Sequence, residues 1–253
     1  MNILGIDIGG SGIKGAIVNT ETGELLSDRH RIDTPKPATP HDVATVIAEI
    51  VNYFKWESTI GCSFPTVVID GQCKSAGNLG DFWIDVQLDQ FFSDYCDGIK
   101  FYVANDADLA GIAEMELGAG KDLSGKVMMV TIGTGIGSAL FNHGELVTNL
   151  EFGRVLHEDG KPIEYFAADS ARKRHELKLK DWAKRFNTFL QHTTRITSPN
   201  HYIIGGGISK KFDKFSKYLN GEVPISVAEF ANNAGIIGAA IYARKNIEKF
   251  QIT

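Results

Sequence analysis

Apolar residues along this chain follow two patterns, short apolar runs typical of strands and longer runs with helical spacing. The opening predicts an antiparallel meander of strands at about 2–8, 13–18 and 25–32, with the Thr22-Gly23 turn before the third. Apolar positions within 43–54 recur three and four residues apart, which predicts a helix. The other predicted elements are strands near 67–69, 101–104, 127–132 and 202–204, and helices near 108–117, 177–194 and 232–247.

The chain contains an internal repeat. Residues 7–19 (DIGGSGIKGAIVN) align with residues 131–142 (TIGTGIGSALFN) with one gap, and each copy reads as strand, glycine turn and strand. Chance similarity between glycine turns is the alternative. The repeat predicts a duplicated α/β fold with two domains flanking a cleft. We place a smaller N-terminal domain at 1–106, joined by a C-terminal helix at 240–253, and a larger domain at 107–239.

Composition and charge narrow the classes of function. The 253 residues carry a net charge of -5, so no global basic field favours nucleic acid. No apolar run approaches the roughly 18 residues that span a bilayer, and the start lacks the basic region of a signal peptide. Cys62, Cys73 and Cys96 form no Cys-x-x-Cys pair, so we expect neither zinc nor disulfides, and a cytoplasmic protein.

The first glycine turn follows the opening strand. Glycines let the backbone approach an anion closely, and exposed N–H groups then bind phosphate oxygens. Asp7, at the end of the strand, can hold a hydrated Mg²⁺. The residues assigned to phosphate here are Gly9, Gly10, Ser11, Gly12 and Lys14.

Two other phosphate motifs compete with this interpretation. Residues 10–15 match the Gly-x-Gly-x-x-Gly dinucleotide fingerprint, but that fingerprint must open a helix. The residues that follow it include β-branched side chains and a turn, which favours a second strand. Residues 120–126 approach a Walker A motif, but Val127 stands where serine or threonine is needed, and a strand follows.

Two further glycine turns extend the phosphate assignment. The second belongs to the repeat, and the third lies between a predicted strand and a helix, where free N–H groups suit an anion or nucleotide. Their assigned residues are Thr131, Gly133, Thr134, Gly135, Gly205, Gly206 and Gly207. Three such turns in this order suit a chain of phosphates better than any one of them alone.

Two groups of polar residues suit the acceptor side of a phosphoryl transfer. Asn105 and Asp106 begin a predicted helix, so Asn105 could be only an N-cap, whereas Asp106 could accept the proton of an alcohol nucleophile. Glu151 and Glu164 lie in a loop-rich stretch. They are either solvated surface groups or acceptors for vicinal sugar hydroxyls.

These motifs together resemble the ROK family of sugar kinases, and in particular its polyphosphate glucokinase branch. The resemblance covers nearly the whole chain. It rests on the glycine turns, on residues 105–114 (NDADLAGIAE) and on residues 34–40 (TPKPATP), which are similar to a segment of polyphosphate-using enzymes. It implies a duplicated actin-like ATPase (ribonuclease H-like) fold, Mg²⁺, a homodimer, and phosphoryl transfer from polyphosphate to the 6-hydroxyl of glucose.

The same resemblance implies roles for individual residues. Asp106 is the implied general base, and the implied hexose ligands are Asn78, Asn105, Asp106, Glu151 and Glu164. The family's Glu-x-Gly-His reads Glu151-Phe-Gly-Arg154 here, and arginine offers no acceptor to a sugar hydroxyl. An ATP-dependent hexose kinase and a catalytically weak sugar-binding homologue therefore stay open. Because the chain begins at the first strand, a DNA-bound sensor is disfavoured.

A run of basic residues near 172–185 has two interpretations, a solvated helix face or an electrostatic track for a long polyanion. Binding of a polyanion to such a track would weaken steeply as the salt concentration rises. The residues assigned to it are Lys36, Arg172, Lys173, Arg174, Lys210 and Lys211.

Overall fold

The computed structural model describes residues 1–77 and 79–252, and the chain divides into two units. The first unit comprises residues 1–113 and the C-terminal segment from Asn233, and the second comprises residues 114–232. This division differs from the predicted borders at 106 and 239, and the first unit is the longer one. Helix α3 (Asp106–Leu117) begins at the predicted border, and its residues 106–113 belong to the first unit.

The first unit contains a five-stranded sheet with the order β3-β2-β1-β4-β7. The first three strands are antiparallel neighbours, and β1, β4 and β7 are parallel. The strands are β1 (Asn2–Gly9), β2 (Gly12–Asn19), β3 (His30–Ile32), β4 (Ile60–Phe64) and β7 (Phe101–Asn105). The third strand is shorter than predicted, because Leu25 makes only an isolated bridge with Val18.

Strand β4 has no counterpart among the predicted elements. Every residue of it is buried, so its sequence, IGCSF, shows no alternation of polar and apolar positions. The predicted strand at 67–69 is instead a two-residue strand, β5 (Val68–Ile69), paired with β6 (Gln72–Cys73). Central strands buried on both faces are hard to recognise when they contain glycine and serine.

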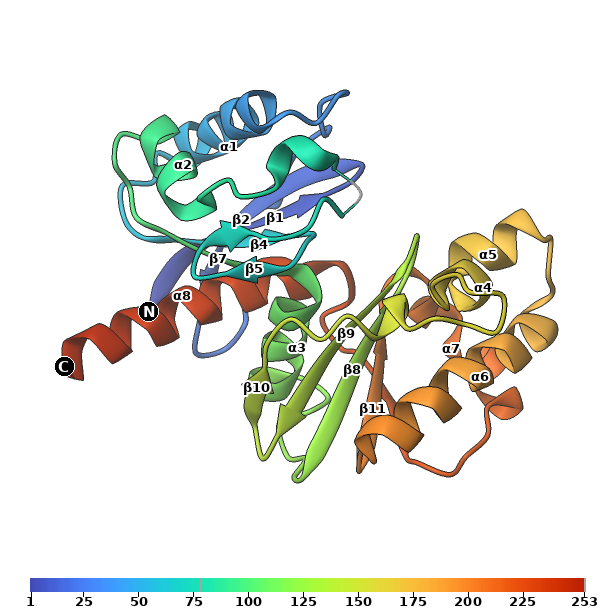
Figure 1. Ribbon diagram of the computed structural model, residues 1–253. Helices are drawn as coiled ribbons and strands as arrows, with labels where there is room; N and C mark the ends of the chain where they lie inside the picture. Colours follow the sequence, from blue (N-terminus) through green and yellow to red (C-terminus); the bar gives the residue numbers. More distant parts are fainter. Residues whose placement is uncertain (78, 253) are drawn as a thin grey trace. The chain divides into compact units, whose positions relative to one another are not determined.

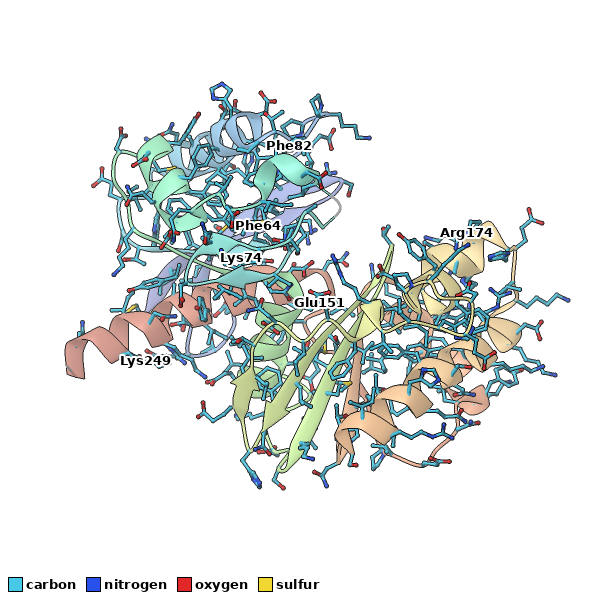
Figure 2. The ribbon with its side chains drawn as sticks, in the orientation of Figure 1. Phe64, Lys74, Phe82, Glu151, Arg174 and Lys249 are labelled. Atoms are coloured by element: carbon cyan, nitrogen blue, oxygen red, sulfur yellow. The ribbon has the colours of Figure 1, made fainter. Side chains whose placement is uncertain are left out.

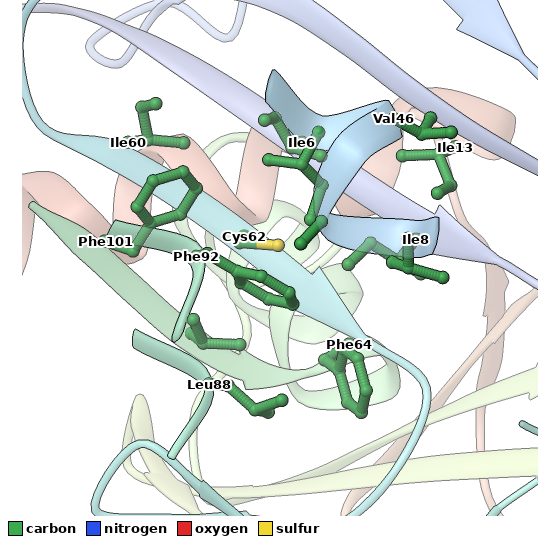
Figure 3. Close-up of a cluster of buried hydrophobic side chains, with 14 of the residues drawn as sticks. Ile6, Ile8, Ile13, Val46, Ile60, Cys62, Phe64, Leu88, Phe92 and Phe101 are labelled. Carbon is green, nitrogen blue, oxygen red and sulfur yellow. The ribbon is translucent and has the colours of Figure 1, made fainter. Parts of the chain in front are cut away.

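Helices cover both faces of the first sheet (Figure 1). Helices α1 (Pro40–Phe54) and α2 (Leu88–Tyr95) enclose one core with the strands, where Ile6, Val46, Phe64 and Phe92 meet (Figure 3). Helix α8 (Ala234–Ile252) packs against the opposite face.

The contact between α8 and the sheet requires glycine on the strands. A Cβ added to Gly5 would lie 2.1 Å from the Ile236 carbonyl oxygen, and one added to Gly61 would lie 1.9 Å from that of Ala239. The helix backbone therefore rests directly on β1 and β4.

The second unit repeats the topology of the first. Its sheet has the order β10-β9-β8-β11-β12, with β8, β9 and β10 antiparallel and β8, β11 and β12 parallel. The strands are β8 (Lys126–Ile132), β9 (Ile136–Asn142), β10 (Glu145–Val147), β11 (His201–Gly205) and β12 (Ile225–Val227). The duplication inferred from the internal repeat is thus confirmed, with the repeat forming β1–turn–β2 and β8–turn–β9.

Helix α6 (Leu179–Thr197) supplies most of the core of the second unit. Its buried Trp182, Phe186 and Phe189 pack in one cluster with Val130 and Tyr202 of the sheet. The shorter helices are α4 (Glu164–Ala167), α5 (Asp169–Arg174) and α7 (Phe212–Phe215), with 3₁₀ turns at 81–83, 152–154, 207–211, 216–218 and 231–233. Within the described residues, no helix is long and apolar enough to cross a membrane.

Candidate active site

The first glycine turn joins two antiparallel strands. Gly10 and Ser11 are the two residues between β1 and β2, which pair along their whole length from Asn2–Asn19 to Gly9–Gly12. A dinucleotide fingerprint would open a helix at this point, so the Rossmann interpretation is excluded. The turn is short and leads from strand to strand, as the repeat predicts.

Asp7 lies in a row of polar residues across three strands. Its Oδ2 accepts a hydrogen bond from Lys14 Nζ at 3.0 Å, and its Oδ1 accepts one from Ser63 Oγ at 2.9 Å. The first turn of α8 approaches the same carboxylate, since a Cβ added to Gly235 would lie 2.8 Å from Oδ1. Each carboxylate oxygen keeps a second lone pair, and Mg²⁺ takes one or two carboxylates with water and phosphate oxygens. The Asp7 carboxylate therefore fits a hydrated Mg²⁺.

Arg31, on β3, is a basic residue beside this turn that the motifs in the sequence did not identify. Its guanidinium group donates to the Ser11 carbonyl oxygen at 2.7 Å and to Asp33 Oδ1 at 2.7 Å. It lies against Gly12, where an added Cβ would approach its Nε to 2.5 Å. No local signal in the sequence marks Arg31, because its place opposite Lys14 depends on the register of β2 and β3. A cation is thus held against the turn assigned to phosphate.

The proline-rich segment 34–40 is anchored at three points. The Thr34 hydroxyl donates to the Gly9 carbonyl oxygen of the first turn. The indole of buried Trp83 donates to the Ala38 carbonyl oxygen at 2.8 Å, and the Thr39 hydroxyl caps α1. Exposed Lys36 therefore stands on a segment that is bonded to the first glycine turn.

Asn105 ends β7 and caps helix α3. Its Oδ1 accepts the N–H groups of Ala107 at 2.9 Å and Asp108 at 3.1 Å, while its Nδ2 donates to the Thr66 carbonyl oxygen at 3.0 Å. The side chain is buried, with 3% of the residue exposed. The capping interpretation is therefore confirmed, and a sugar contact would be a second task for the same amide.

Asp106 begins α3 at the carboxyl end of β7 and is partly exposed. Strands β1, β4 and β7 are parallel, and Asp7, Ser63 and Ala104 share one row across them. Asp106 comes two residues after that row. Ligands of open α/β sheets bind beyond the carboxyl ends of parallel strands, which is where Asp7 and Asp106 lie.

The second glycine turn is held by side chains from α4 and α5. Glu164 Oε2 accepts the Ile136 N–H at 3.0 Å, and a Cβ added to Gly135 would lie 2.3 Å from that oxygen. Ser170, in the first turn of α5, donates its N–H to the Gly133 carbonyl and its hydroxyl to the Thr134 carbonyl at 2.6 Å. Glu164 is thus a structural partner of the turn and not a solvated surface group.

Glu151 precedes a short 3₁₀ turn at 152–154. This turn packs against Ile136 of β9, the residue whose N–H group bonds to Glu164. A Cβ added to Gly153 would lie 2.1 Å from the Ile136 carbonyl oxygen, so only glycine fits there. The segments that carry Glu151 and Glu164 therefore meet at Ile136. Arg154 lies 3.7 Å from Glu151 through its Nε and forms an ion pair with it. Figure 2 shows Glu151 on the stretch that precedes this turn.

The third glycine turn lies beside the second. Gly206 has a φ of 78°, and an added Cβ would lie 2.4 Å from the Ile132 nitrogen at the end of β8. A side chain would be both strained and obstructed at this position. A 3₁₀ helix follows at 207–211 and leads directly into α7, and it carries the exposed Lys210 and Lys211. The structure therefore brings together the second and third sets of residues assigned to phosphate.

The basic run near 172 is partly neutralised. Arg172 Nε lies 2.6 Å and Lys173 Nζ 3.0 Å from the buried carboxylate of Asp169. Burial raises the pKa of Asp169, but the hydrogen bonds and charges of these two partners outweigh it and hold that pKa below its usual value. Arg174 donates instead to the Tyr165 carbonyl oxygen. Of the six residues assigned to a track, Arg172 and Lys173 are therefore paired with a carboxylate, whereas Arg174 bonds to a backbone carbonyl. Asn78, which was assigned to sugar binding, lies outside the described residues.

Known proteins share both sequence and fold with this chain. A family profile described as "ROK family" matches residues 3–155. The chain is 42% identical over 244 residues to a polyphosphate glucokinase of Mycobacterium leprae, covering 96% of this chain and 75% of that protein. It is 43% identical over 238 residues to a polyphosphate glucokinase of Mycobacterium tuberculosis (strain CDC 1551 / Oshkosh), covering 94% and 89%.

Solved structures extend the comparison. An inorganic polyphosphate/ATP-glucomannokinase from Arthrobacter sp. strain KM superposes with a TM-score of 0.92 at 38% identity, covering 97% of this chain and 99% of that one. A ROK family glucokinase from Streptomyces griseus, in complex with glucose and AMPPNP, has a TM-score of 0.82 at 21% identity, which speaks for the fold alone. It covers 97% of this chain and 100% of that one.

Proposed function

The chain belongs to the ROK family, and we propose that it transfers a phosphoryl group from polyphosphate to the 6-hydroxyl of glucose. The observation that carries the proposal is the 42% and 43% identity to two polyphosphate glucokinases over more than nine-tenths of this chain. The product is glucose 6-phosphate. The actin-like ATPase fold, with its two sheets of identical order, agrees with this activity.

Polyphosphate is the proposed donor because of the surroundings of the first glycine turn. Segment 34–40 is bonded to Gly9, and two cations, Arg31 and Lys14, lie beside the turn. The glycine turns assigned to phosphate, at 9–12, 131–135 and 205–207, would bind donor oxygens through N–H groups. ATP is the second candidate donor, since the name of the Arthrobacter glucomannokinase includes both donors.

The proposed mechanism places the proton acceptor at Asp106. Its carboxylate takes the proton of the 6-hydroxyl as the oxygen attacks the terminal phosphorus of the donor. The bond from that phosphorus to its bridging oxygen breaks, and the shortened polyphosphate leaves with the bonding electron pair. Lys14 and the N–H groups of the glycine turns stabilise the negative charge on the transferred group.

Asp7 is the residue that would hold Mg²⁺ through water. When bound there, the ion supplies positive charge to the phosphate oxygens. Lys14 and Ser63, which hydrogen-bond to the same carboxylate, orient it for an ion.

Hexose binding is proposed for Asn105, Asp106, Glu151 and Glu164, with Asn78 assigned on resemblance alone. Ionised carboxylates accept two hydroxyl donors at once, which suits vicinal sugar hydroxyls. Asn105 and Glu164 also hold their own loops, so their side chains are oriented before the sugar binds. A homodimer and a cytoplasmic location remain proposals that rest on the family.

The test is hexose 6-phosphate formation by the purified protein with Mg²⁺ and glucose, comparing long-chain polyphosphate with ATP at low and moderate salt. We expect turnover with polyphosphate that falls as salt rises, because a polyanion bound by cations releases counterions. Turnover with ATP alone would show that ATP is the donor and would leave glucose as the acceptor. An absence of turnover with either donor would reject the kinase and favour the weak sugar-binding homologue.

A further inference from the structure

A basic hollow of about 700 Å³ lies on the second unit, formed by α4, α5, the start of α6 and the loop before α4. We propose that it binds phosphate groups of a long polyphosphate chain, away from the phosphates that react. Its lining residues are Asp159, Lys161, Tyr165, Phe166, Arg174, His175 and Arg185. The proposal deepens the proposed function, on which the choice of polyphosphate rests.

Among the described residues, none forms an ion pair with Lys161, Arg174 or Arg185 of the hollow. Within the described part of the chain, no carboxylate oxygen lies within 4.0 Å of a charged nitrogen of Lys161, Arg174 or Arg185. The one carboxylate that lines the hollow, Asp159, accepts the backbone N–H of Lys161. This contrasts with Lys173, whose charge is paired at 3.0 Å. A chain with a net charge of -5 therefore keeps three permanent cations unpaired around one concavity, and like charges gathered in this way repel each other until an anion binds.

Both guanidinium groups of the hollow are held in place. Arg174, labelled in Figure 2, donates through Nη2 to the Tyr165 carbonyl oxygen at 2.7 Å. The Arg185 guanidinium lies over the Phe166 ring, 4.7 Å from its centroid, and the same ring stacks on His157 at 4.3 Å. Arginine held in this way loses less conformational entropy when it binds an anion, and its planar N–H groups match phosphate oxygens. The geometry therefore favours a phosphate ligand over a diffuse counterion cloud.

The hollow is connected to the second glycine turn by helix α5. Ser170, in its first turn, is bonded to the carbonyl groups of Gly133 and Thr134, and Arg174 is its last residue. At about 1.5 Å of rise per residue, six helical residues span roughly 9 Å. A donor with phosphates at the glycine turn can reach Arg174 only if the chain continues well beyond the reacting end. Long polyphosphate has enough phosphates to occupy the glycine turn and the hollow at once, whereas ATP ends in a nucleoside after three phosphates.

The test uses Lys161→Gln and the double variant Arg174→Gln/Arg185→Gln in the full chain, with Lys184→Gln as control. Lys184 lies on the same helix as Arg185 but is exposed and paired with Asp181 at 3.5 Å. Equilibrium binding of long-chain polyphosphate and of tripolyphosphate is measured over a range of salt concentrations, together with glucose phosphorylation from both donors. Lys161 is exposed on a loop, so its variant tests the hollow even if the double variant folds poorly.

We expect weaker binding of long-chain polyphosphate, with the slope of log affinity against log salt reduced by about one for each cation removed. Binding of tripolyphosphate and turnover with ATP should match the wild type. Unchanged affinity and slope for the long chain in Lys161→Gln would overturn the proposal, as would an equal loss for tripolyphosphate. If the wild-type protein binds long polyphosphate but makes no glucose 6-phosphate, the proposed function is wrong, and the proposal that the hollow binds polyphosphate still stands. Wild-type protein that binds none would reject both.

Discussion

The side chain of Arg154 forms an ion pair with Glu151, with Nε and Oε2 3.7 Å apart. The pair spans a 3₁₀ turn that is fixed by the close packing of Gly153 on Ile136. Half of the Arg154 side chain is exposed, so the pair contributes less than about 1 kcal/mol to stability. Its effect is on the carboxylate, which is oriented toward a cation at the position proposed for sugar binding.

Replacing Arg154 by histidine should therefore change sugar affinity more than stability. A neutral imidazole offers an acceptor nitrogen and removes the guanidinium charge beside Glu151. We expect the KM for glucose in Arg154→His to fall several-fold, with the KM for polyphosphate unchanged. Steady-state kinetics with each substrate varied would measure this, with the exposed Arg195→His as a control. A glucose KM that stays the same or rises would show that Arg154 itself assists binding.

Asp106→Asn tests the proposed general base. Loss of a general base typically costs about 10²–10⁴-fold in rate, and we expect a fall in kcat of that size with polyphosphate. Asparagine keeps an acceptor oxygen for the Ala107 N–H, so the unfolding transition should change little. Exposed Asp122→Asn is the matched control. Full turnover in Asp106→Asn would remove Asp106 from the proton transfer.

Asn105→Ala should destabilise the protein, because the side chain caps α3 and also donates to Thr66. Loss of an N-cap costs about 0.5–2 kcal/mol, and the unpaired Thr66 carbonyl adds to this. Asn105→Ser keeps a capping oxygen and should recover part of the loss. Denaturant unfolding of the three proteins measures the difference. Equal stability of wild type and Asn105→Ala would mean that the cap contributes nothing.

Asp169→Asn should lower stability in a pH-dependent way. The folded pKa of Asp169 lies below its ordinary value of 3.8, since its bonds to Arg172 and Lys173 outweigh burial. The stabilisation is therefore fully present above that value and is lost as the pH falls through the folded pKa. We expect a deficit of about 1–3 kcal/mol at neutral pH that shrinks in acid. A loss of stability that is the same at every pH would show that Asp169 stabilises the protein through packing and not through its charge.

The same variant has a second expected consequence. Removing the carboxylate frees the charges of Arg172 and Lys173, which α5 carries together with Arg174 of the basic hollow. Long-chain polyphosphate should therefore bind more tightly to Asp169→Asn, with a steeper salt dependence. Binding measured beside the unfolding experiment checks this. Weaker binding at unchanged salt slope would show that Asp169 orders α5 for the ligand.

The sequence by itself determined the duplicated topology and the nature of the glycine turns. Both depend on local properties, namely the short apolar runs of β1, β2, β8 and β9 and the steric freedom of glycine between them. The position of Asp106 at the start of a helix followed from the same local reasoning. Strand β4 escaped it, because its five buried residues include glycine and serine and so form neither an alternating pattern nor an unbroken apolar run.

Only the tertiary structure decided which charges are available to a ligand. Asp169 neutralises two of the cations assigned to a track, whereas Arg174 and Arg185 lack a carboxylate partner within the described residues. Arg31 reaches the Ser11 carbonyl from twenty residues away in the chain. Contacts of this kind depend on strand register and on helix packing, which bring distant residues together and leave no periodic trace in the sequence.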